Sequence, residues 1–181
     1  FYANRFSILF IDNAGKKTQY LNSLNNLTKC SPQHMHGDLL KSYFDLSKFS
    51  STFTMVRHPV ERIVSEYNFR MKIAKIEKTK NIEINAWINE ALQAYSSNPY
   101  IYDNHLRPQS QFLVENCKIF KLEDKMNSQW VESVEKHCDI KFKIRDVRIF
   151  FASGLPTKDI GMKLSKKTFD LIYKFYEKDF E

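Results

Sequence analysis

Two strand-like segments of this sequence each end in a turn with cationic residues and lead into an amphipathic helical pattern. The first β-rich run covers residues 5–11, meets turn-forming residues at 12–15 and precedes a helical pattern over 16–27. The second run covers 52–56 and is broken by Pro59, which suits the first turn of a following helix. Strands that alternate with helices usually pair in parallel, so the sequence predicts an α/β fold with a mainly parallel β-sheet flanked by helices.

The alternation continues to the end of the 181 residues, and we take 1–181 as a single domain. A third strand is predicted at 117–122, and 148–152 is either a strand or a buried loop. The spacing of apolar residues predicts three further helices, at 82–95, 130–138 and 165–180.

Apolar stripes on these helices predict which faces are buried. The helix after Pro59 carries Val60, Ile63, Val64, Tyr67 and Met71, and the helix at 82–95 carries Ile84, Trp87, Ile88, Ala91 and Leu92. In the last helix we expect Ser165 at the N-cap. One core face is predicted there, with Phe169, Ile172, Tyr173 and Tyr176.

Composition narrows the classes of function. The chain has 28 lysines and arginines against 21 aspartates and glutamates, a net charge of +7, which indicates an anionic partner. No motif of a nucleic-acid-binding protein is present, so nucleic acid is not the expected partner. Three cysteines without C-x-x-C spacing indicate neither a disulfide framework nor a zinc site, and no run of about 20 apolar residues predicts a transmembrane segment.

The first of the two turns has the residue types of a phosphate-binding loop. Gly15 permits close approach of the backbone, two lysines add positive charge and Thr18 adds a hydroxyl. The loop lacks the second glycine of the Walker A pattern G-x-x-x-x-G-K-S/T, and an ordinary solvated loop is the alternative. The candidate phosphate contacts are Asn13, Ala14, Gly15, Lys16, Lys17 and Thr18.

The second turn places a cation at the end of a predicted strand. Arg57 ends that strand, and Ser65 lies eight residues later, two turns into the following helix. A guanidinium fork and a hydroxyl so placed can reach one phosphate group. The alternative is that Arg57 pairs with Glu61 or Glu66 and that Ser65 is a small packing residue.

Residues 53–67, FTMVRHPVERIVSEY, resemble the segment F-x-x-V-R-(N/D)-P-x-x-R-x-x-S-x-Y of carbohydrate sulfotransferases. These enzymes use 3′-phosphoadenosine 5′-phosphosulfate, and the resemblance is closest to the heparan and chondroitin type. It implies a P-loop NTPase-like sulfotransferase fold. It also implies that Arg57 and Ser65 bind the 3′-phosphate of the donor.

Further segments resemble the same family in order and spacing. They are 36–40, which contains His36; 107–110 and 120–123, which resemble the R-P-Q and F-x-x-(I/L)-E blocks; and 175–180, which resembles Y-x-x-D-(F/Y). The first loop departs from the family, because Asn13 stands where the family has a lysine. Either Lys16 or Lys17 takes over that role, or the donor is held differently, or activity is low.

The resemblance suggests roles for the remaining candidates. Sulfuryl transfer proceeds in line and needs no metal. We expect His36 to be the base, with Lys16 or Lys17 stabilising the leaving phosphate. His34 is the reserve base. His34, Asp38 and Arg107 are candidate contacts for the acceptor, and Asp38 can also orient His36. Glu123 is expected to brace the donor site or a nearby loop, or to be an ordinary acid at the end of a strand.

The sequence thus predicts transfer of a sulfuryl group from 3′-phosphoadenosine 5′-phosphosulfate to a hydroxyl of a carbohydrate acceptor, which leaves 3′,5′-adenosine bisphosphate. The alternatives are a P-loop-type kinase of a nucleotide or small molecule, and a non-catalytic binder of polyanions. Frequent Lys, Asn and Ile favour a bacterial cytoplasmic enzyme. The sequon at 26–28 leaves a Golgi lumenal enzyme open.

Overall fold

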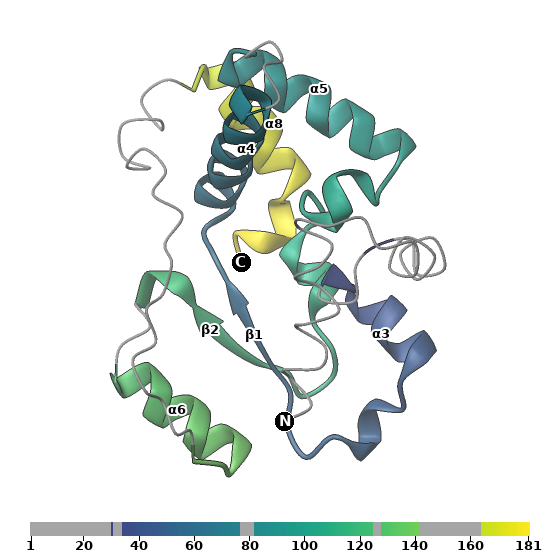
Figure 1. Cartoon of the computed structure of the whole chain (residues 1–181), viewed down its shortest axis with the longest axis vertical. Helices are drawn as coiled ribbons and strands as arrows, with labels where there is room; N and C mark the ends of the chain where they lie inside the picture. The colour runs from purple at the N-terminus through teal and green to yellow at the C-terminus, as the bar shows by residue number, and fades with distance from the viewer. Residues whose placement is uncertain (1–29, 31–33, 77–81, 125–127, 142–163) are drawn as a thin grey trace.

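A parallel pair of strands lies at the centre of the computed structural model, which describes residues 30, 34–76, 82–124, 128–141 and 164–181 (Figure 1). Strand β1 (Phe53–Val56) pairs with β2 (Lys118–Lys121), with Phe53 opposite Lys118 and Val56 opposite Lys121. This confirms the second and third predicted strands and the parallel pairing. The elements predicted at 5–11, 16–27 and 148–152 lie outside the described residues.

Helical elements account for most of the rest of the described chain. The α-helices are α3 (Gly37–Tyr43), α4 (Pro59–Ile76), α5 (Ile84–Ser97), α6 (Ser128–Cys138) and α8 (Lys166–Phe175). Short 3₁₀ helices are η2 (Leu46–Lys48), η3 (Ile101–Asn104), η4 (Gln109–Phe112), η5 (Leu122–Asp124) and η6 (Glu177–Asp179). The described part is therefore mixed α/β, with a small parallel sheet.

Helices α4, α5 and α8 pack on one another beyond the carboxyl end of β1, which leads directly into α4 (Figure 1). Their contact forms the main hydrophobic core. Every residue of the predicted stripe on α5 is buried, and Ile63 and Val64 of α4 are each only 1% exposed. The stripes predicted for these two helices are confirmed.

Local sequence fixes where these helices begin. Pro59 is the first residue of α4, as expected for a residue with a fixed φ and no N–H. The Glu83 carboxylate caps α5 by accepting from the N–H groups of Asn85 and Ala86. The predicted N-cap of α8 is confirmed, because the Ser165 hydroxyl accepts from the N–H of Thr168 at 3.1 Å.

The predicted core face of α8 is partly wrong. Ile172 and Tyr176 are buried, at 0% and 2% exposure, but Phe169 and Tyr173 are 44% and 51% exposed. The buried face is instead completed by Thr168, which is 1% exposed and is satisfied by its contacts with Ser165. The predicted face does not include Thr168, because a hydroxyl residue is less apolar than the neighbouring aromatics.

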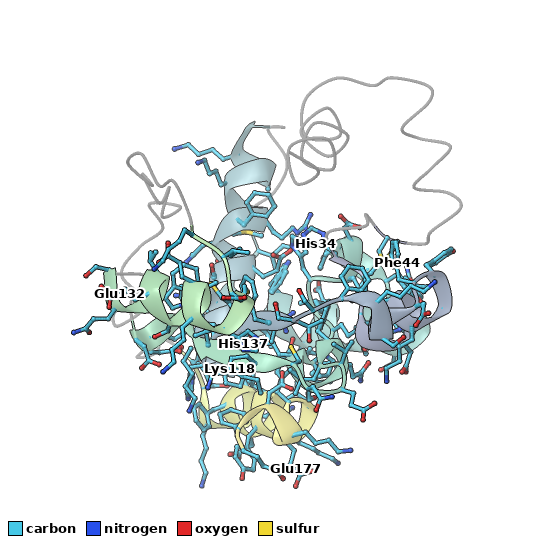
Figure 2. The ribbon with its side chains drawn as sticks, turned by 90° about the horizontal axis from the view of Figure 1, so that it is seen from below. His34, Phe44, Lys118, Glu132, His137 and Glu177 are labelled. Carbon is cyan, nitrogen blue, oxygen red and sulfur yellow. The ribbon has the colours of Figure 1, made fainter. Side chains whose placement is uncertain are left out.

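Helices α3 and α6 lie on opposite sides of the strand pair (Figures 1 and 2). His137 of α6 bonds the carbonyl of Thr52, immediately before β1, at 2.9 Å. The N-terminus of α3 approaches η4 closely, since a Cβ added to Gly37 would lie 2.7 Å from the Leu113 carbonyl oxygen. Among the described residues, no helix is both long and apolar enough to cross a membrane.

We predict that Tyr176→Phe lowers the free energy of unfolding by about 1–2 kcal/mol. The Tyr176 hydroxyl donates to the carbonyl of Leu106 at 2.8 Å, and both groups are buried, so the substitution leaves a buried acceptor unpaired. Tyr173→Phe on the same helix is the matched control and should change stability little, because Tyr173 is half exposed. Chemical denaturation of the three proteins measures the difference, and equal stabilities would contradict the assignment.

Candidate active site

The backbone of Arg57, just beyond the end of β1, is held by the side chain of Gln109. The Arg57 N–H donates to Gln109 Oε1 at 2.8 Å, and Gln109 Nε2 donates to the Arg57 carbonyl at 2.7 Å. These are the two bonds that a neighbouring strand would exchange with this residue. The amide of Gln109 therefore takes the place of a neighbouring strand at the first residue after β1 and fixes the backbone from which the Arg57 side chain leaves the sheet.

Two carboxylates support this arrangement from distant parts of the chain. Asp179 accepts from the N–H groups of Gln109 and Ser110 at 2.6 and 2.8 Å, which holds the start of η4 in place. Glu123, just after β2, accepts from the N–H of His58 at 2.6 Å. This contact is a loop brace, one of the roles predicted for Glu123. The 107–110, 120–123 and 175–180 segments thus converge on the end of β1.

The Arg57 side chain lies along the first turn of α4. Its Nε–H donates to Glu61 at 3.2 Å, so the ion pair that the sequence left as an alternative is formed. A guanidinium has five N–H donors, and the other four make no hydrogen bond within the described residues. Glu61 and Ser65 are one helical turn apart, so Arg57 reaches the turn that precedes Ser65.

Ser65 differs from two other serines within the long helices, Ser96 and Ser133. Ser96 and Ser133 donate to the carbonyl four residues earlier, at 3.3 and 2.8 Å, as mid-helix serines commonly do. The Ser65 hydroxyl makes no hydrogen bond to any residue that the structure describes, and the side chain is partly exposed. It is therefore available to donate to a ligand.

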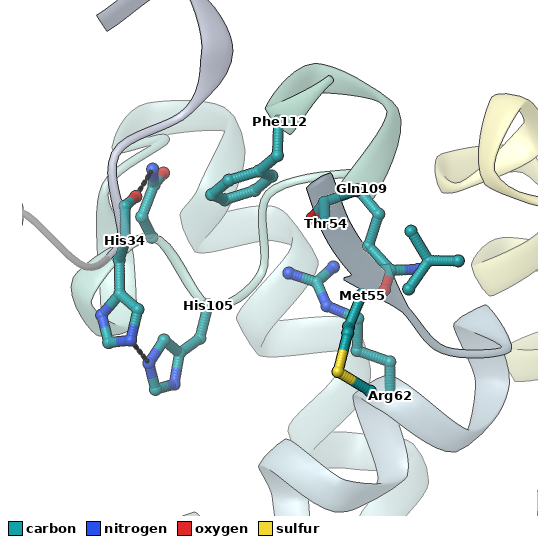
Figure 3. Close-up of a pocket in the computed structure, with 9 residues that line it drawn as sticks. His34, Thr54, Met55, Arg62, His105, Gln109 and Phe112 are labelled. Atoms are coloured by element: carbon teal, nitrogen blue, oxygen red, sulfur yellow. Dashed lines mark hydrogen bonds between the residues drawn. The ribbon is translucent and has the colours of Figure 1, made fainter. Parts of the chain in front are cut away.

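A pocket of about 170 Å³ opens beside the strand pair (Figure 3). Two of its polar groups are placed by bonds to neighbouring segments: Arg62 of α4 donates to the carbonyl of Arg107 at 2.7 Å, and Asn104 donates to that of His34 at 2.7 Å. His36 and Arg57 are not among its lining residues. The lining is formed by His34, Thr54, Met55, Val56, Arg62, Asn104, His105, Gln109 and Phe112.

His36 is buried at the N-cap of α3, with 9% exposure, and its ring lies 5.9 Å from that of Tyr100. Burial and the nearby charge of Arg107 lower its pKa, against the opposing effect of Asp38. The imidazole is thus neutral at neutral pH. Its Nδ1 is buried and makes no hydrogen bond to the described residues.

Two histidines that line the pocket, His34 and His105, belong to a network with carboxylates that lie outside the lining. His34 Nδ1 contacts Asp103 at 2.8 Å, His105 Nδ1 contacts Glu66 at 2.9 Å, and Arg70 donates to Glu66 at 2.6 Å. Burial raises the pKa of Glu66, but the bonds and charges of His105 and Arg70 outweigh it and the net shift is downward. Sequence reasoning placed Asp103 and His105 only in a polar loop, because nothing in their spacing links them to His34.

The other predicted site residues lie in different surroundings. Arg107 is 7% exposed, and its guanidinium donates to Asn104 at 2.6 Å and to Gln111 at 2.7 Å. Its contact with an acceptor stays a prediction, as does that of Asp38, which is exposed in the first turn of α3. The predicted donor loop, Asn13, Ala14, Gly15, Lys16, Lys17 and Thr18, lies outside the described residues.

The fold and the site define an α/β protein whose polar side chains gather where a parallel strand ends, as ligand sites of this class do. A comparison with protein families matches residues 5–181 to the Sulfotransferase family. The chain belongs to this family and is a transferase. Neither the curated proteins nor the solved structures contain a significant match.

We predict that Gln109→Ala lowers the free energy of unfolding by about 2 kcal/mol, because two partly buried hydrogen bonds to the Arg57 backbone are lost. The variant should also weaken any ligand bound by Arg57. Gln129→Ala, the same substitution at an exposed residue of α6, is the control. Thermal and chemical denaturation measure the effect, and a Gln109 variant as stable as the control would contradict the role assigned to this amide.

Proposed function

We propose that this protein is a carbohydrate sulfotransferase that uses 3′-phosphoadenosine 5′-phosphosulfate. The observation that carries the proposal is the pair Arg57 and Ser65. The Arg57 backbone is fixed at the end of β1, and its side chain reaches the turn before Ser65. Both side chains keep hydrogen-bond donors that no described residue uses. The R-P-Q, F-x-x-(I/L)-E and Y-x-x-D-(F/Y) segments meet at the same strand end, which supports the resemblance that suggested the donor.

The donor set fits a doubly charged phosphate. The terminal nitrogens of Arg57 can form two parallel bonds to phosphate oxygens, and the Ser65 hydroxyl can add a third. Glu61 accepts only from Nε, so it can hold the guanidinium while the outer nitrogens bind. The N-terminal turn of α4 adds the positive end of an 18-residue helix on the same side.

The bound donor supplies the sulfuryl group that the acceptor hydroxyl receives, with loss of 3′,5′-adenosine bisphosphate. His36 removes the proton of that hydroxyl as the new oxygen–sulfur bond forms and the bond to the 5′-phosphate breaks. Its neutral imidazole suits this role. Asn13, Ala14, Gly15 and Thr18 cradle the 5′-phosphate, and Lys16 or Lys17 neutralises the charge that develops there.

The acceptor is a carbohydrate hydroxyl. The pocket beside β1 is the proposed place for a sugar next to the one that reacts, because His36, the proposed base, does not line this pocket. Arg62 and Gln109 supply polar groups there, and Phe112 supplies an aromatic face (Figure 3). His34, Asp38 and Arg107 are proposed acceptor contacts, of which His34 lines the pocket. The net charge of +7 favours an acidic glycan over a neutral one.

We predict that the protein binds 3′,5′-adenosine bisphosphate more tightly than 5′-AMP, and that Arg57→Gln removes this preference. A charged bidentate contact contributes about 2 kcal/mol, so the variant should bind the bisphosphate about thirtyfold more weakly while its affinity for 5′-AMP stays the same. Ser65→Ala should weaken binding of the bisphosphate by a smaller factor than Arg57→Gln.

Calorimetric titration of both nucleotides measures these affinities. Lys118→Gln, which removes an exposed charge from β2, is the control for a general loss of positive charge. Equal weak binding of both nucleotides by the wild-type protein would contradict the assignment of the 3′-phosphate to Arg57 and Ser65.

We predict that His36→Gln lowers sulfuryl transfer to a glycan panel by a factor of about a hundred, because a general base contributes at least that much. His34→Gln should act mainly on KM for the acceptor. His58→Gln is the matched control, since the His58 side chain is exposed and only its N–H contacts Glu123.

Transfer from labelled donor separates the possible outcomes. Full activity of the His36 variant beside a large loss in kcat for the His34 variant would move the base to His34. Lys16→Ala and Lys17→Ala, assayed together with these, identify the lysine that replaces the family residue at Asn13. Magnesium-dependent turnover of ATP without sulfuryl transfer would favour the kinase alternative.

A further inference from the structure

Two histidines from distant parts of the chain face each other at the wall of the pocket. The rings of His34 and His105 are 4.3 Å apart between centroids, nearly perpendicular at 82°, and their Nε2 atoms are 3.2 Å apart (Figure 3). His34 is the first residue of the described segment 34–76, whereas His105 directly follows η3. The sequence separation of 71 means that the tertiary fold alone brings them together.

The opposite nitrogen of each ring is held by a carboxylate. Asp103 Oδ2 lies 2.8 Å from His34 Nδ1, and Glu66 Oε2 lies 2.9 Å from His105 Nδ1. An ionised carboxylate only accepts hydrogen bonds, so each Nδ1 carries the proton and each Nε2 presents a lone pair. Two lone pairs on nitrogens 3.2 Å apart repel unless a proton or a metal ion bridges the two atoms.

Carboxylates behind both imidazoles are the outer-shell arrangement found around histidine ligands of metals, where they fix the tautomer and raise the basicity of the ligand. Arg70 donates to Glu66 at 2.6 Å and keeps that carboxylate in place. Asn104, which is fully buried, donates to the His34 carbonyl and fixes the backbone of the first histidine. Further hydrogen bonds thus fix both the Glu66 carboxylate and the backbone of His34.

The distances suit a transition-metal ion. A zinc–nitrogen bond is about 2.0–2.1 Å long, so two ligand nitrogens of a tetrahedral site are about 3.3 Å apart. The observed 3.2 Å between the Nε2 atoms is close to this separation. One ligand atom from each of His34, Asp103 and His105 also lies within 4.8 Å of the others. Both histidine side chains keep more than a quarter of their surface exposed, so an ion and its waters can enter.

We propose that His34 and His105 bind a divalent transition-metal ion through their Nε2 atoms, with Asp103 and Glu66 orienting the two rings and water completing the coordination. Imidazole ligands favour Zn²⁺, Ni²⁺, Co²⁺ or Cu²⁺, whereas Mg²⁺ and Ca²⁺ prefer oxygen. The site does not include His36 or the Arg57–Ser65 pair, but it shares His34 with the proposed acceptor pocket, which both histidines line. It goes beyond the sulfuryl transfer proposed above, which needs no metal, and does not depend on it.

The test uses the full chain with its affinity tag removed, treated with a chelator and returned to a buffer that does not bind metals. Calorimetric titration with Zn²⁺ should show about one equivalent bound per chain. Titration with Co²⁺ should give the visible absorption of nitrogen and oxygen ligands. The intense charge-transfer band of thiolate ligands should be absent, which excludes binding by the three cysteines.

His34→Gln and His105→Gln should each weaken Zn²⁺ binding by a factor of about a hundred. Asp103→Asn and Glu66→Gln keep the shape of the outer shell and should weaken it about tenfold. His58→Gln removes an exposed histidine and should leave the affinity unchanged. Circular dichroism and thermal melts show whether each variant is folded. If a histidine variant does not fold, the Zn²⁺ affinities of Asp103→Asn and Glu66→Gln decide the test instead.

Three results would overturn the proposal. They are the absence of stoichiometric binding in the wild-type protein, equal affinities for the wild-type and the histidine variants, and a loss in His58→Gln as large as in His105→Gln. The first of these would leave a proton shared between the two Nε2 atoms as the cation that separates them. Activity measurements are not needed for any of these readouts, so failure of the sulfotransferase proposal would leave the metal test intact.

Discussion

The pairing of the Gln109 amide with the backbone of Arg57 is the interaction on which the site depends. Strand β1 is only four residues long, and its described partner β2 ends opposite Val56. Without Gln109, the N–H and carbonyl of Arg57 would lie at a strand end with no ladder partner among the described residues. The amide supplies both bonds, and Asp179 fixes the backbone of Gln109 in turn. The C-terminal segment thereby determines where the first residue after β1 points.

Helix α4 presents polar side chains on two different faces. It begins two residues after Arg57, so the strand end also sets its rotation. Glu61 and Ser65 share one face with the Arg57 side chain, whereas Glu66 and Arg70 lie on another, with His105. Five residues along an α-helix correspond to a rotation of about 140°, which separates Glu61 from Glu66. One face of α4 therefore holds Arg57 through Glu61, and the other holds His105 through Glu66. Each carboxylate binds its own partner.

Periodicity and motifs predicted part of this arrangement. The alternation of strands and helices indicated β1, β2 and their parallel pairing, and the motif at 53–67 singled out Arg57 and Ser65 because both lie on neighbouring elements. The bonds of Gln109 and Asp179 join residues 52 and 70 positions apart, and no local pattern encodes such contacts. The face of α8 was assigned wrongly for a related reason. Ile172 and Tyr176 lie on one helix face with Phe169 and Tyr173 and equally well on one face with Thr168. Thr168, whose N–H bonds the Ser165 hydroxyl, is the buried residue, whereas the two aromatic residues are exposed.

His34 and His36 show most clearly why residue type and spacing are insufficient. They are two residues apart, and the sequence favours His36 as the base, with His34 in reserve, because His36 matches the position of a histidine in the family. In the fold, His34 faces Asp103 across 2.8 Å and lines the pocket, whereas His36 is buried near the charge of Arg107, which helps to lower its pKa. Burial and the nearby guanidinium of Arg107 favour the neutral form of the His36 imidazole. Asn104 connects the two environments, because it donates to the His34 carbonyl and accepts from Arg107. The buried turn around Asn104 thus gives different surroundings to two histidines that only the family resemblance distinguished in the sequence.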